Sequence, residues 1–576
     1  MKLKSIYTVL TFLVFTSQTS FAQNALYIPT ALTGTTFNLK VQSGFQKFYD
    51  TIKTPTYGVN GTWLAPTIIA NKGDSIILNV KNELSVKTTM HWHGLHVAPE
   101  NDGGPHQIIK PNTTWSPSFK IRNNAATFWY HPHGAGQTDP QVSKGIAGFF
   151  IVKDAAEAAL NLPRTYGVDD IPICIQSKAF DELKQIAIAT NMDTALFVNG
   201  TLNTYYNTAA QVIRFRLLNG SSLRSYNIGF SNGQTFYQIA TDGGLLDTSI
   251  ALTRLRLSPG ERAEILVNFS GMMGQTIYLK SFASELPTGI YGAATVGFGA
   301  DTIHEYSDNF LNGADFNLLQ LNIGTQTATP VTIIPTSLIP YIPFNINSAT
   351  NYRTIIFDTL RLLPFETPNL AEGPFGMNNH TFDMDSINET IHLNTTEVWT
   401  LINNTLVAHP FHIHDIQFNV IEKNGVPTPP SELGWKDVVL VMPDDSVKFI
   451  TKFETFANST IPYMYHCHLL HHEDDGMMGS FLVIDTNIKT GIVNIKKQNF
   501  DLYPNPVSKT LFLNFNNEFP FAEINVVNVL GETVLKQNIS DTKNTTLDVD
   551  DLANGIYFIQ IKTHTIFLTQ KFIKQQ

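Results

Sequence analysis

A thirteen-residue stretch that begins at His466, HCHLLHHEDDGMM, brings a thiol, imidazoles and a thioether close together in the chain. On a strand, neighbouring side chains point to opposite faces, so His466 and His468 would share one face and the Cys467 thiol would lie on the other. One short strand could therefore contact two metal centres. Cys467 also combines with His472 and Met477 into a set of thiolate, imidazole and thioether groups, which are the ligands of blue-copper sites.

Three further histidine clusters lie upstream: HWH at 91–93, HPH at 131–133 and HPFHIH at 409–414. In extended backbone the two rings of a His-x-His pair point the same way. His412 and His414 therefore share a face, whereas His409 falls on the opposite side and could serve a second centre. A single His-x-His pair would be interpreted as two ordinary hydrogen-bonded histidines. Four clusters together favour copper over a structural zinc site, which four ligands would close.

The elements that must position these residues are predicted to be strands. The chain has 576 residues, of which 43% are hydrophobic and 15% charged, with 37 Gly and 29 Pro. This composition is typical of a turn-rich, all-β protein, and the length requires several domains. The formal charge of -10 disfavours nucleic acid as a partner and offers no polybasic patch for a membrane surface.

The clusters divide the chain into β blocks. The first block (23–156) and the third block (344–487) carry all four clusters, whereas the second block (157–324) contains only His304, so metal chemistry is expected to bypass it. We predict a Thr/Pro/Ile-rich connector at 325–343, a linker at 488–499 and a small separate β domain at 500–576.

The N-terminus has the features of a secretory signal peptide. Lys2 and Lys4 precede an apolar run at 6–15, and small residues favour cleavage after Ala22, so residues 1–22 would be removed. The alternative is an uncleaved anchor, but the apolar run is too short to span a bilayer, and no other stretch predicts a membrane anchor.

Only two cysteines occur, Cys174 and Cys467. We expect no disulfide between them, because pairing would remove the thiolate that a copper ligand requires. Cys174 lies in the apolar stretch IPICI, which predicts a buried small hydrophobe.

Over residues 23–485 the four clusters resemble the copper signatures of the multicopper oxidases, the laccase-like family with three cupredoxin domains. The similarity is closest to bacterial laccase-like enzymes, copper-efflux cuprous oxidases and bilirubin oxidases. The resemblance implies three cupredoxin-like Greek-key domains of β-sandwich or barrel type. Supporting stretches are VNGTWLAPTI at 59–68, LLNGS at 217–221, LSPGER at 257–262 and HTFDM at 380–384.

The resemblance also implies four copper ions and assigns their ligands, none of which is substituted here. It assigns the type 1 copper to His409, Cys467 and His472, with Met477 axial. It assigns the type 2 copper to His91 and His412. The pair of type 3 coppers would be held by His93, His131, His133, His414, His466 and His468. The alternation argument predicts the same division, because it separates His409 and Cys467 from their neighbours.

The mechanism implied by the resemblance uses O2 and a small reducing substrate. Electrons would enter at the type 1 copper one at a time and pass through Cys467 to the flanking histidines and the three-copper cluster. Four electrons would then reduce O2 to two waters. Asp102 and Glu473 match acidic positions that supply protons in similar copper-efflux oxidases. The alternative reading of each is a solvated loop carboxylate.

The reducing substrate is predicted from the methionines. The 11 methionines are scattered and form no Met-rich segment, which favours phenols and aromatic amines over metal ions. Oxidation of Cu(I) or Fe(II) is the alternative. A copper-free cupredoxin scaffold that binds partners is an alternative from a different class, and copper nitrite reductase would need no set of six type 3 histidines.

The C-terminal block resembles the sorting domain of type IX secretion substrates. The matching motifs are YPNP at 503–506, VLGE at 529–532 and LANGIY at 552–557. With the signal peptide, this resemblance implies passage through the periplasm, recognition by the type IX machinery, and a secreted or cell-surface protein from which the domain is removed. The alternative is a small adhesive β module.

Overall fold

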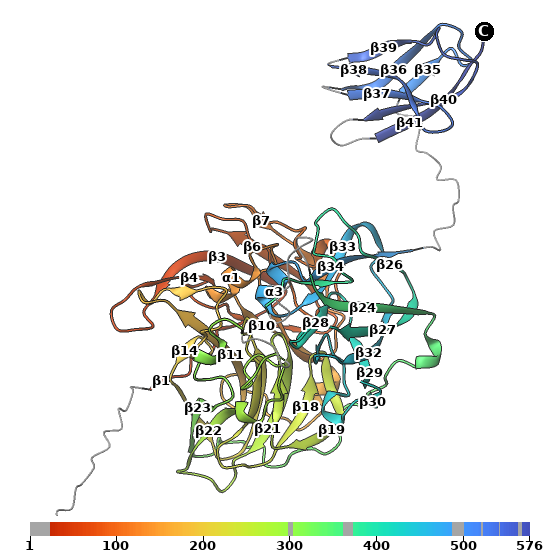
Figure 1. Cartoon of the computed structure of the whole chain (residues 1–576). Helices are drawn as coiled ribbons and strands as arrows, with labels where there is room; N and C mark the ends of the chain where they lie inside the picture. The colour runs from red at the N-terminus through yellow and green to blue at the C-terminus, as the bar shows by residue number, and fades with distance from the viewer. Residues whose placement is uncertain are drawn as a thin grey trace, which may run out of the picture. The chain divides into compact units, whose positions relative to one another are not determined.

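A computed structural model of the chain describes residues 23–297, 303–360, 372–485, 500–519, 522–540, 542–562 and 567–576. The chain divides into two compact units, the first ending at 486 and the second beginning at 487 (Figure 1). The predicted signal peptide and the predicted linker lie outside the described residues. No helix among the described residues is long and apolar enough to cross a membrane.

Strands dominate the first unit and confirm the predicted all-β fold, with two sheets and a main hydrophobic core in each of the three predicted blocks. The core of the third block also includes Tyr291, Val296, Ile303 and Tyr306 of the second block. In the first block, one sheet has the order β4-β3-β6-β7, with β8 also on β6, and the other has the order β2-β5-β10-β9. Their bounds are β2 (Ala31–Thr33), β3 (Thr36–Gln46), β4 (Thr54–Val59), β5 (Thr67–Asn71), β6 (Ser75–Asn82), β7 (Thr114–Trp115), β8 (Ser118–Lys120), β9 (Ala126–Tyr130) and β10 (Gly148–Lys153).

The second block has sheets in the orders β14-β13-β11-β16-β21-β18-β19, with β12 on β11, and β1-β15-β23-β22-β17-β20. Because β1 (Asn24–Ala25) pairs in parallel with β15, the start of the described chain joins this block rather than the first. The other bounds are β11 (Asp170–Phe180), β12 (Ile186–Ala187), β13 (Ala195–Val198), β14 (Thr201–Leu202), β15 (Thr204–Ala209), β16 (Val212–Asn219), β17 (Tyr226–Phe230), β18 (Phe236–Thr241), β19 (Gly244–Leu252), β20 (Leu255–Leu257), β21 (Arg262–Asn268), β22 (Thr276–Phe282) and β23 (Asp315–Gly324).

The third block has sheets in the orders β25-β24-β27-β32-β29-β30 and β26-β34-β33-β28-β31. The bounds are β24 (Asn351–Thr359), β25 (Phe375–Met377), β26 (Glu389–His392), β27 (Thr395–Asn403), β28 (His409–Ile413), β29 (Phe418–Lys423), β30 (Val426–Pro427), β31 (Val438–Val441), β32 (Ser446–Phe453), β33 (Asn458–Cys467) and β34 (Met478–Ile484). The described residues of this unit also form three short α-helices: α1 (Thr138–Ser143), α2 (Ala155–Ala158) and α3 (Leu470–Asp474).

Burial along the strands follows their place in the sheets. The first six residues of β3 alternate between exposed and buried, as expected for a strand with one face in solvent. β28 lies between β33 and β31, and all five of its residues are buried. A strand covered on both faces can carry polar groups only if they find partners inside the protein. The histidines of β28 are therefore held on a strand that is buried along its whole length.

The second unit is a separate β domain with its own core. Its sheets have the orders β35-β36-β39 and β38-β37-β40-β41. The bounds are β35 (Phe500–Tyr503), β36 (Thr510–Phe519), β37 (Ala522–Val527), β38 (Thr533–Ile539), β39 (Thr542–Asp548), β40 (Gly555–Lys562) and β41 (Phe567–Lys574). None of the grouped metal-ligating side chains among the described residues belongs to it.

Candidate metal centre

The register of two antiparallel strands separates the predicted copper ligands of the third block. β28 and β33 pair so that Phe411 faces Cys467 and His412 faces His466. Directly opposed residues share a face of the sheet, and His409 shares the face of Phe411 because it lies two residues away. His409 and Cys467 therefore point into the hydrophobic core of the third block. His412 and His466 point away from that core, on the opposite face of the sheet.

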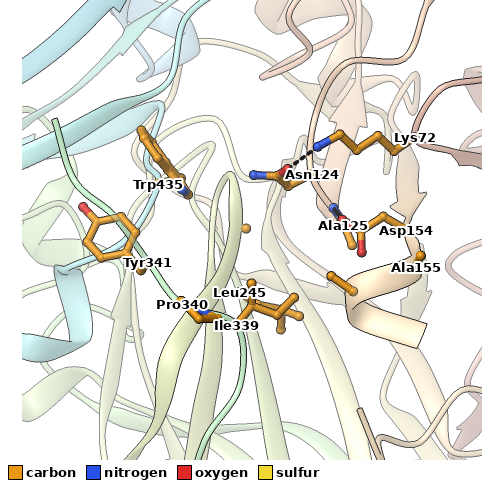
Figure 2. A pocket seen from close by; sticks show the side chains of 12 residues that line it. Lys72, Asn124, Ala125, Asp154, Ala155, Leu245, Ile339, Pro340, Tyr341 and Trp435 are labelled. Carbon is orange, nitrogen blue, oxygen red and sulfur yellow. Dashed lines mark hydrogen bonds between the residues drawn. The ribbon is translucent and has the colours of Figure 1, made fainter. Parts of the chain in front are cut away.

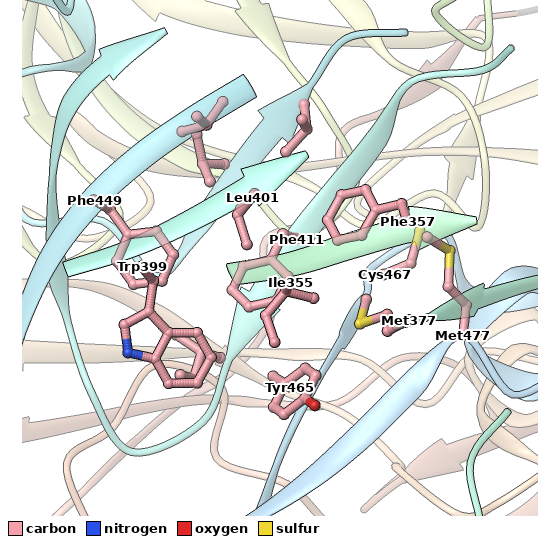
Figure 3. Close-up of a cluster of buried hydrophobic side chains, with 14 of the residues drawn as sticks. Ile355, Phe357, Met377, Trp399, Leu401, Phe411, Phe449, Tyr465, Cys467 and Met477 are labelled. Atoms are coloured by element: carbon pink, nitrogen blue, oxygen red, sulfur yellow. The ribbon is translucent and has the colours of Figure 1, made fainter. Parts of the chain in front are cut away.

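On the core side, His409, Cys467 and His472 form one group. The Cys467 sulfur lies 3.4 Å from Nδ1 of His409 and 4.0 Å from Nδ1 of His472, and the two ring nitrogens are 3.3 Å apart. His472 reaches the group from α3, which begins three residues after Cys467. Met477 is fully buried, and its carbonyl accepts a hydrogen bond from the Cys467 amide at 3.0 Å. Figure 3 shows Cys467, Met377 and Met477 at one edge of the aromatic and aliphatic core.

Burial sets the protonation of this group. It lowers the pKa of His409 to about 3, so the ring is neutral and its nitrogen lone pair is free at neutral pH. Burial also raises the pKa of the Cys467 thiol, so a bound cation is needed to hold the thiolate. A soft, buried donor set of one thiol and two neutral imidazoles fits copper.

On the other side, eight buried histidines from the first and third blocks converge. They form three groups whose ligand nitrogens lie within 4.8 Å of one another: His91, His412 and His414; His93, His131 and His468; and His133, His414 and His466. The first two sequence clusters meet because His91 and His131 form a β-bridge, with reciprocal amide–carbonyl bonds of 2.8 and 3.2 Å. The clusters at 91–93 and 131–133 therefore lie just outside regular strands, since β9 ends at Tyr130.

Ring nitrogens face one another across this space. Nε2 of His133 lies 3.0 Å from Nε2 of His414 and 3.1 Å from Nε2 of His466, and the buried Nε2 atoms of His91 and His412 have no hydrogen-bond partner. Two unprotonated ring nitrogens at such distances repel each other unless a proton or a cation lies between them. Burial, followed by the charges of neighbouring rings, lowers the pKa of several members well below the ordinary value; these are His93, His131, His133, His412 and His468. Neutral rings aimed at a common space fit metal ions.

The outer nitrogens of the rings are held by protein oxygens, which fixes each tautomer. Nδ1 of His91 donates to the Asp102 carbonyl at 2.9 Å, Nδ1 of His412 donates to the Asp437 carbonyl at 2.8 Å, and Nδ1 of His131 donates to the Pro132 carbonyl at 2.8 Å. In each of these rings Nε2 is left facing inward.

The two acids predicted to supply protons are both buried against this cluster, so neither is a solvated loop carboxylate. Asp102 Oδ2 accepts from Nδ1 of His414 at 2.7 Å, and Glu473 lies 3.2 Å from Nδ1 of His466. Glu473 also accepts the Thr138 hydroxyl hydrogen bond at 2.7 Å. Burial alone would raise the pKa of Asp102, but the charges of His414 and His91 lower it below the ordinary value.

Two residues contact the histidine groups although no motif in the sequence predicted them. Asp437 Oδ1 lies 3.1 Å from Nε2 of His93, and the hydroxyl of Tyr291 lies 3.3 Å from Nε2 of His472. A carboxylate or phenol is common in any sequence, so only the tertiary contact identifies these two. Cys174 is free and buried, as is Cys467.

A cavity of about 430 Å³ opens elsewhere, between Trp435 and Tyr341 on one side and Lys72 on the other (Figure 2). Its polar groups bond to one another: Lys72 Nζ donates to Asn124 at 2.7 Å, and Asp154 accepts from the Ala125 amide at 2.9 Å. It shares no lining residue with either histidine group.

Comparison with known proteins agrees with this geometry. Residues 40–157 and 349–487 each match a family model described as Multicopper oxidase. The chain is 33% identical over 457 residues to Multicopper oxidase mco of Staphylococcus haemolyticus, an alignment that covers 78% of this chain and 88% of the relative. The chain belongs to the multicopper oxidase family. It is therefore a copper-dependent oxidoreductase, and the predicted resemblance is confirmed.

Other known proteins are also similar to this chain in sequence or structure. Cell division protein FtsP of Escherichia coli is 30% identical, over 77% of this chain and 89% of the relative. The laccase-like oxidase CueO of Ochrobactrum sp. superposes with a TM-score of 0.69 at 29% identity, covering 80% of this chain and all of that chain. A metallo-oxidase from Campylobacter jejuni has a TM-score of 0.67 at 26% identity, covering 81% and 96%. Residues 501–575 match the Secretion system C-terminal sorting domain, which confirms that prediction and indicates export by type IX secretion.

Proposed function

We propose that this multicopper oxidase couples the one-electron oxidation of phenols or aromatic amines to the four-electron reduction of O2 to water. His409, Cys467, His472 and Met477 would hold a type 1 copper. The eight converging histidines would hold three more, with His91 and His412 on the type 2 ion and the other six, His93, His131, His133, His414, His466 and His468, on the type 3 pair. The observation that carries the proposal is the direct covalent link between the two sites, since Cys467 belongs to one and its chain neighbours to the other.

Bound copper would supply the redox chemistry, by accepting single electrons at the type 1 site and delivering four of them to O2. The chain supplies the path and the geometry. From the Cys467 sulfur, the backbone leads in one direction to His466 and in the other to His468, so an uninterrupted covalent path connects the two sites. Asp102 and Glu473 would relay protons to the cluster, because each has a carboxylate oxygen within 3.2 Å of a ring nitrogen.

The organic substrate is supported by the absence of a Met-rich segment in the sequence and by the surroundings of the type 1 rings. Nε2 of His409 lies 2.8 Å from the Thr405 hydroxyl, and Nε2 of His472 lies 3.3 Å from the Tyr291 hydroxyl. Neutral hydroxyls at both rings, with Phe375 packed 4.7 Å from His472, suit an uncharged aromatic reductant better than a metal ion.

One observation favours the alternative, oxidation of Cu(I) or Fe(II). A cavity of about 800 Å³ is lined by His380, Asp383 and Glu389, and also by Met377, which belongs to the same core as Cys467. Imidazole, carboxylate and thioether groups can receive metal ions. Steady-state turnover of a phenol, Cu(I) and Fe(II) by one preparation separates the two, and a higher kcat/KM for either metal ion would overturn the organic assignment.

Copper content and absorption spectra test the class as a whole. We expect four coppers per chain, with a blue type 1 band and a near-ultraviolet type 3 band. A protein that takes up no copper on reconstitution would instead support the copper-free scaffold.

We also propose that the chain crosses the periplasm and is released or displayed outside the cell. Mass spectrometry of culture supernatant and surface fractions would test this. Retention of the full-length protein in the periplasm would contradict it.

A further inference from the structure

The second block supplies no histidine to the cluster, yet its LSPGER loop packs against it. Gly260 has a φ of +84°, and a Cβ at this position would lie 2.8 Å from Cδ2 of His468. The loop therefore needs glycine for two reasons, its left-handed backbone and the space taken by the ligand ring. The motif singled out in the sequence is thus a contact surface for the cluster.

Arg262 is the last residue of this LSPGER stretch and the first residue of β21, and it forms a buried two-pronged ion pair with Asp437. Nη1 lies 2.6 Å from Oδ1 of Asp437, and Nη2 lies 2.6 Å from Oδ2. Both side chains have no exposed surface. A buried carboxylate is stable only when it is paired and hydrogen-bonded, so Arg262 determines where Asp437 can lie.

The remaining donors of Arg262 tie it to two blocks. Nε donates to the Thr127 carbonyl of β9 at 3.1 Å, Nη1 to the Gly260 carbonyl at 3.0 Å and Nη2 to the Asp242 carbonyl at 3.0 Å. With Asp437 in the third block, the guanidinium contacts all three blocks. Its planar fork has little freedom to rotate, and it holds the Asp437 carboxylate in one orientation.

Asp437 in turn contacts two rings of the histidine cluster and helps to fix their orientation. Its Oδ1 lies 3.1 Å from Nε2 of His93, and its carbonyl accepts from Nδ1 of His412. His93 is turned the opposite way from its neighbours, because its Nδ1 faces inward, 3.3 Å from Nε2 of His468. An outward Nε2–H needs an acceptor, and Asp437 provides it.

Gly94, directly after the HWH cluster, makes room for the same pair. Its φ is +83°, and a Cβ there would lie 2.4 Å from Oδ2 of Asp437 and 2.9 Å from Nη2 of Arg262. Gly94 thus makes room for the ion pair beside the histidine cluster, as Gly260 makes room for the His468 ring.

We propose that Arg262 and Asp437 are positioning residues of the O2-reducing site, which fix the tautomer and the ring orientation of His93. The inference rests on the proposed function. It makes the second block a working part of the copper cluster rather than a spacer between the two blocks that carry the ligands.

The test uses the full-length copper-loaded protein with Arg262→Lys and Asp437→Asn. Lysine keeps the charge but cannot hold both carboxylate oxygens, and asparagine keeps the shape but loses the charge. We expect each variant to keep the blue band, to lose intensity in the near-ultraviolet type 3 band, and to lower kcat by about 10- to 100-fold with an unchanged KM for the reducing substrate.

Arg216→Lys is the matched control, because Arg216 is equally buried in the second block but pairs with Asp170 and Glu264 instead of Asp437. It should lower stability and leave the ratio of the two bands unchanged. Equal band ratios in Arg262→Lys, Asp437→Asn and the unmodified protein would overturn the inference alone. Equal spectral losses in Arg216→Lys and Arg262→Lys would reduce Arg262 to a structural role. An unmodified protein without either band would overturn the proposed function itself.

Discussion

Replacement of Glu264 by glutamine tests the buried charges that join the first two blocks. Glu264 lies on β21, and its Oε2 accepts from Arg214 Nε at 2.9 Å while its Oε1 accepts from Arg216 and from the Thr127 hydroxyl, both at 2.7 Å. Thr127 lies on β9, four residues before His131, a proposed copper ligand. Glutamine keeps the size of the side chain but removes its charge, so both arginines are left with fewer negative partners.

The expected loss of folding free energy follows from the pKa of the Glu264 carboxyl. Burial alone would raise it, but the charges of Arg214 and Arg216 lower it from 4.5 to about 2. This difference corresponds to about 3 kcal/mol of folding free energy, as expected when one partner of a buried ion pair is removed. Because the folded-state pKa lies below the unfolded value, the stabilisation is fully present above about pH 5 and is lost as the pH falls through 4.5 towards 2.

Equilibrium urea unfolding, followed by tryptophan fluorescence at matched copper loading, measures the difference. Glu285→Gln is the control, because Glu285 forms a similar pair with Arg254 at 2.7 Å but is 45% exposed in its side chain. The control should change the free energy of unfolding by less than about 1 kcal/mol. An equal effect of the two substitutions at pH 7, or a Glu264→Gln effect that does not shrink in acid, would refute the reasoning.

Three further predictions concern the copper sites. Cys467→Ser should abolish the blue band and leave the near-ultraviolet band, since serine offers no thiolate; absorption spectra decide this, and a surviving blue band would contradict it. Glu473→Gln should slow O2 consumption by about 100-fold or more at an unchanged blue band. Asp475→Asn, which changes an exposed side chain nearby, should not. If an oxygen electrode measures equal rates for Glu473→Gln and the unmodified protein, the proton relay is discarded. Tyr291→Phe should lower the KM for small phenols, because it frees the His472 ring nitrogen as a hydrogen-bond partner; steady-state kinetics with an unchanged or raised KM would argue against this role.

The spacing of histidines and cysteine along the chain predicted much of the site, because side chains on a strand alternate between its two faces. Alternation in HCH separates Cys467 from His466, and the spacing in HPFHIH separates His409 from His412; the observed register of β28 and β33 produces the same division. The sorting domain and the family were also predictable, since their motifs are contiguous in the chain. The expectation that the second block is bypassed holds for its histidines, but not for the backbone at Gly260, which packs against His468.

Sequence alone predicts which side chains can bind copper and how neighbours on one strand divide between two sites, because bond geometry along extended backbone fixes both over a few residues. Which clusters meet, and which residues hold them together, is visible only in the folded protein. His93 and Asp437 are 344 residues apart, and Asp437 and Arg262 are 175 apart. Such contacts depend on how three cores pack together, and no local period of apolar or polar residues encodes that packing.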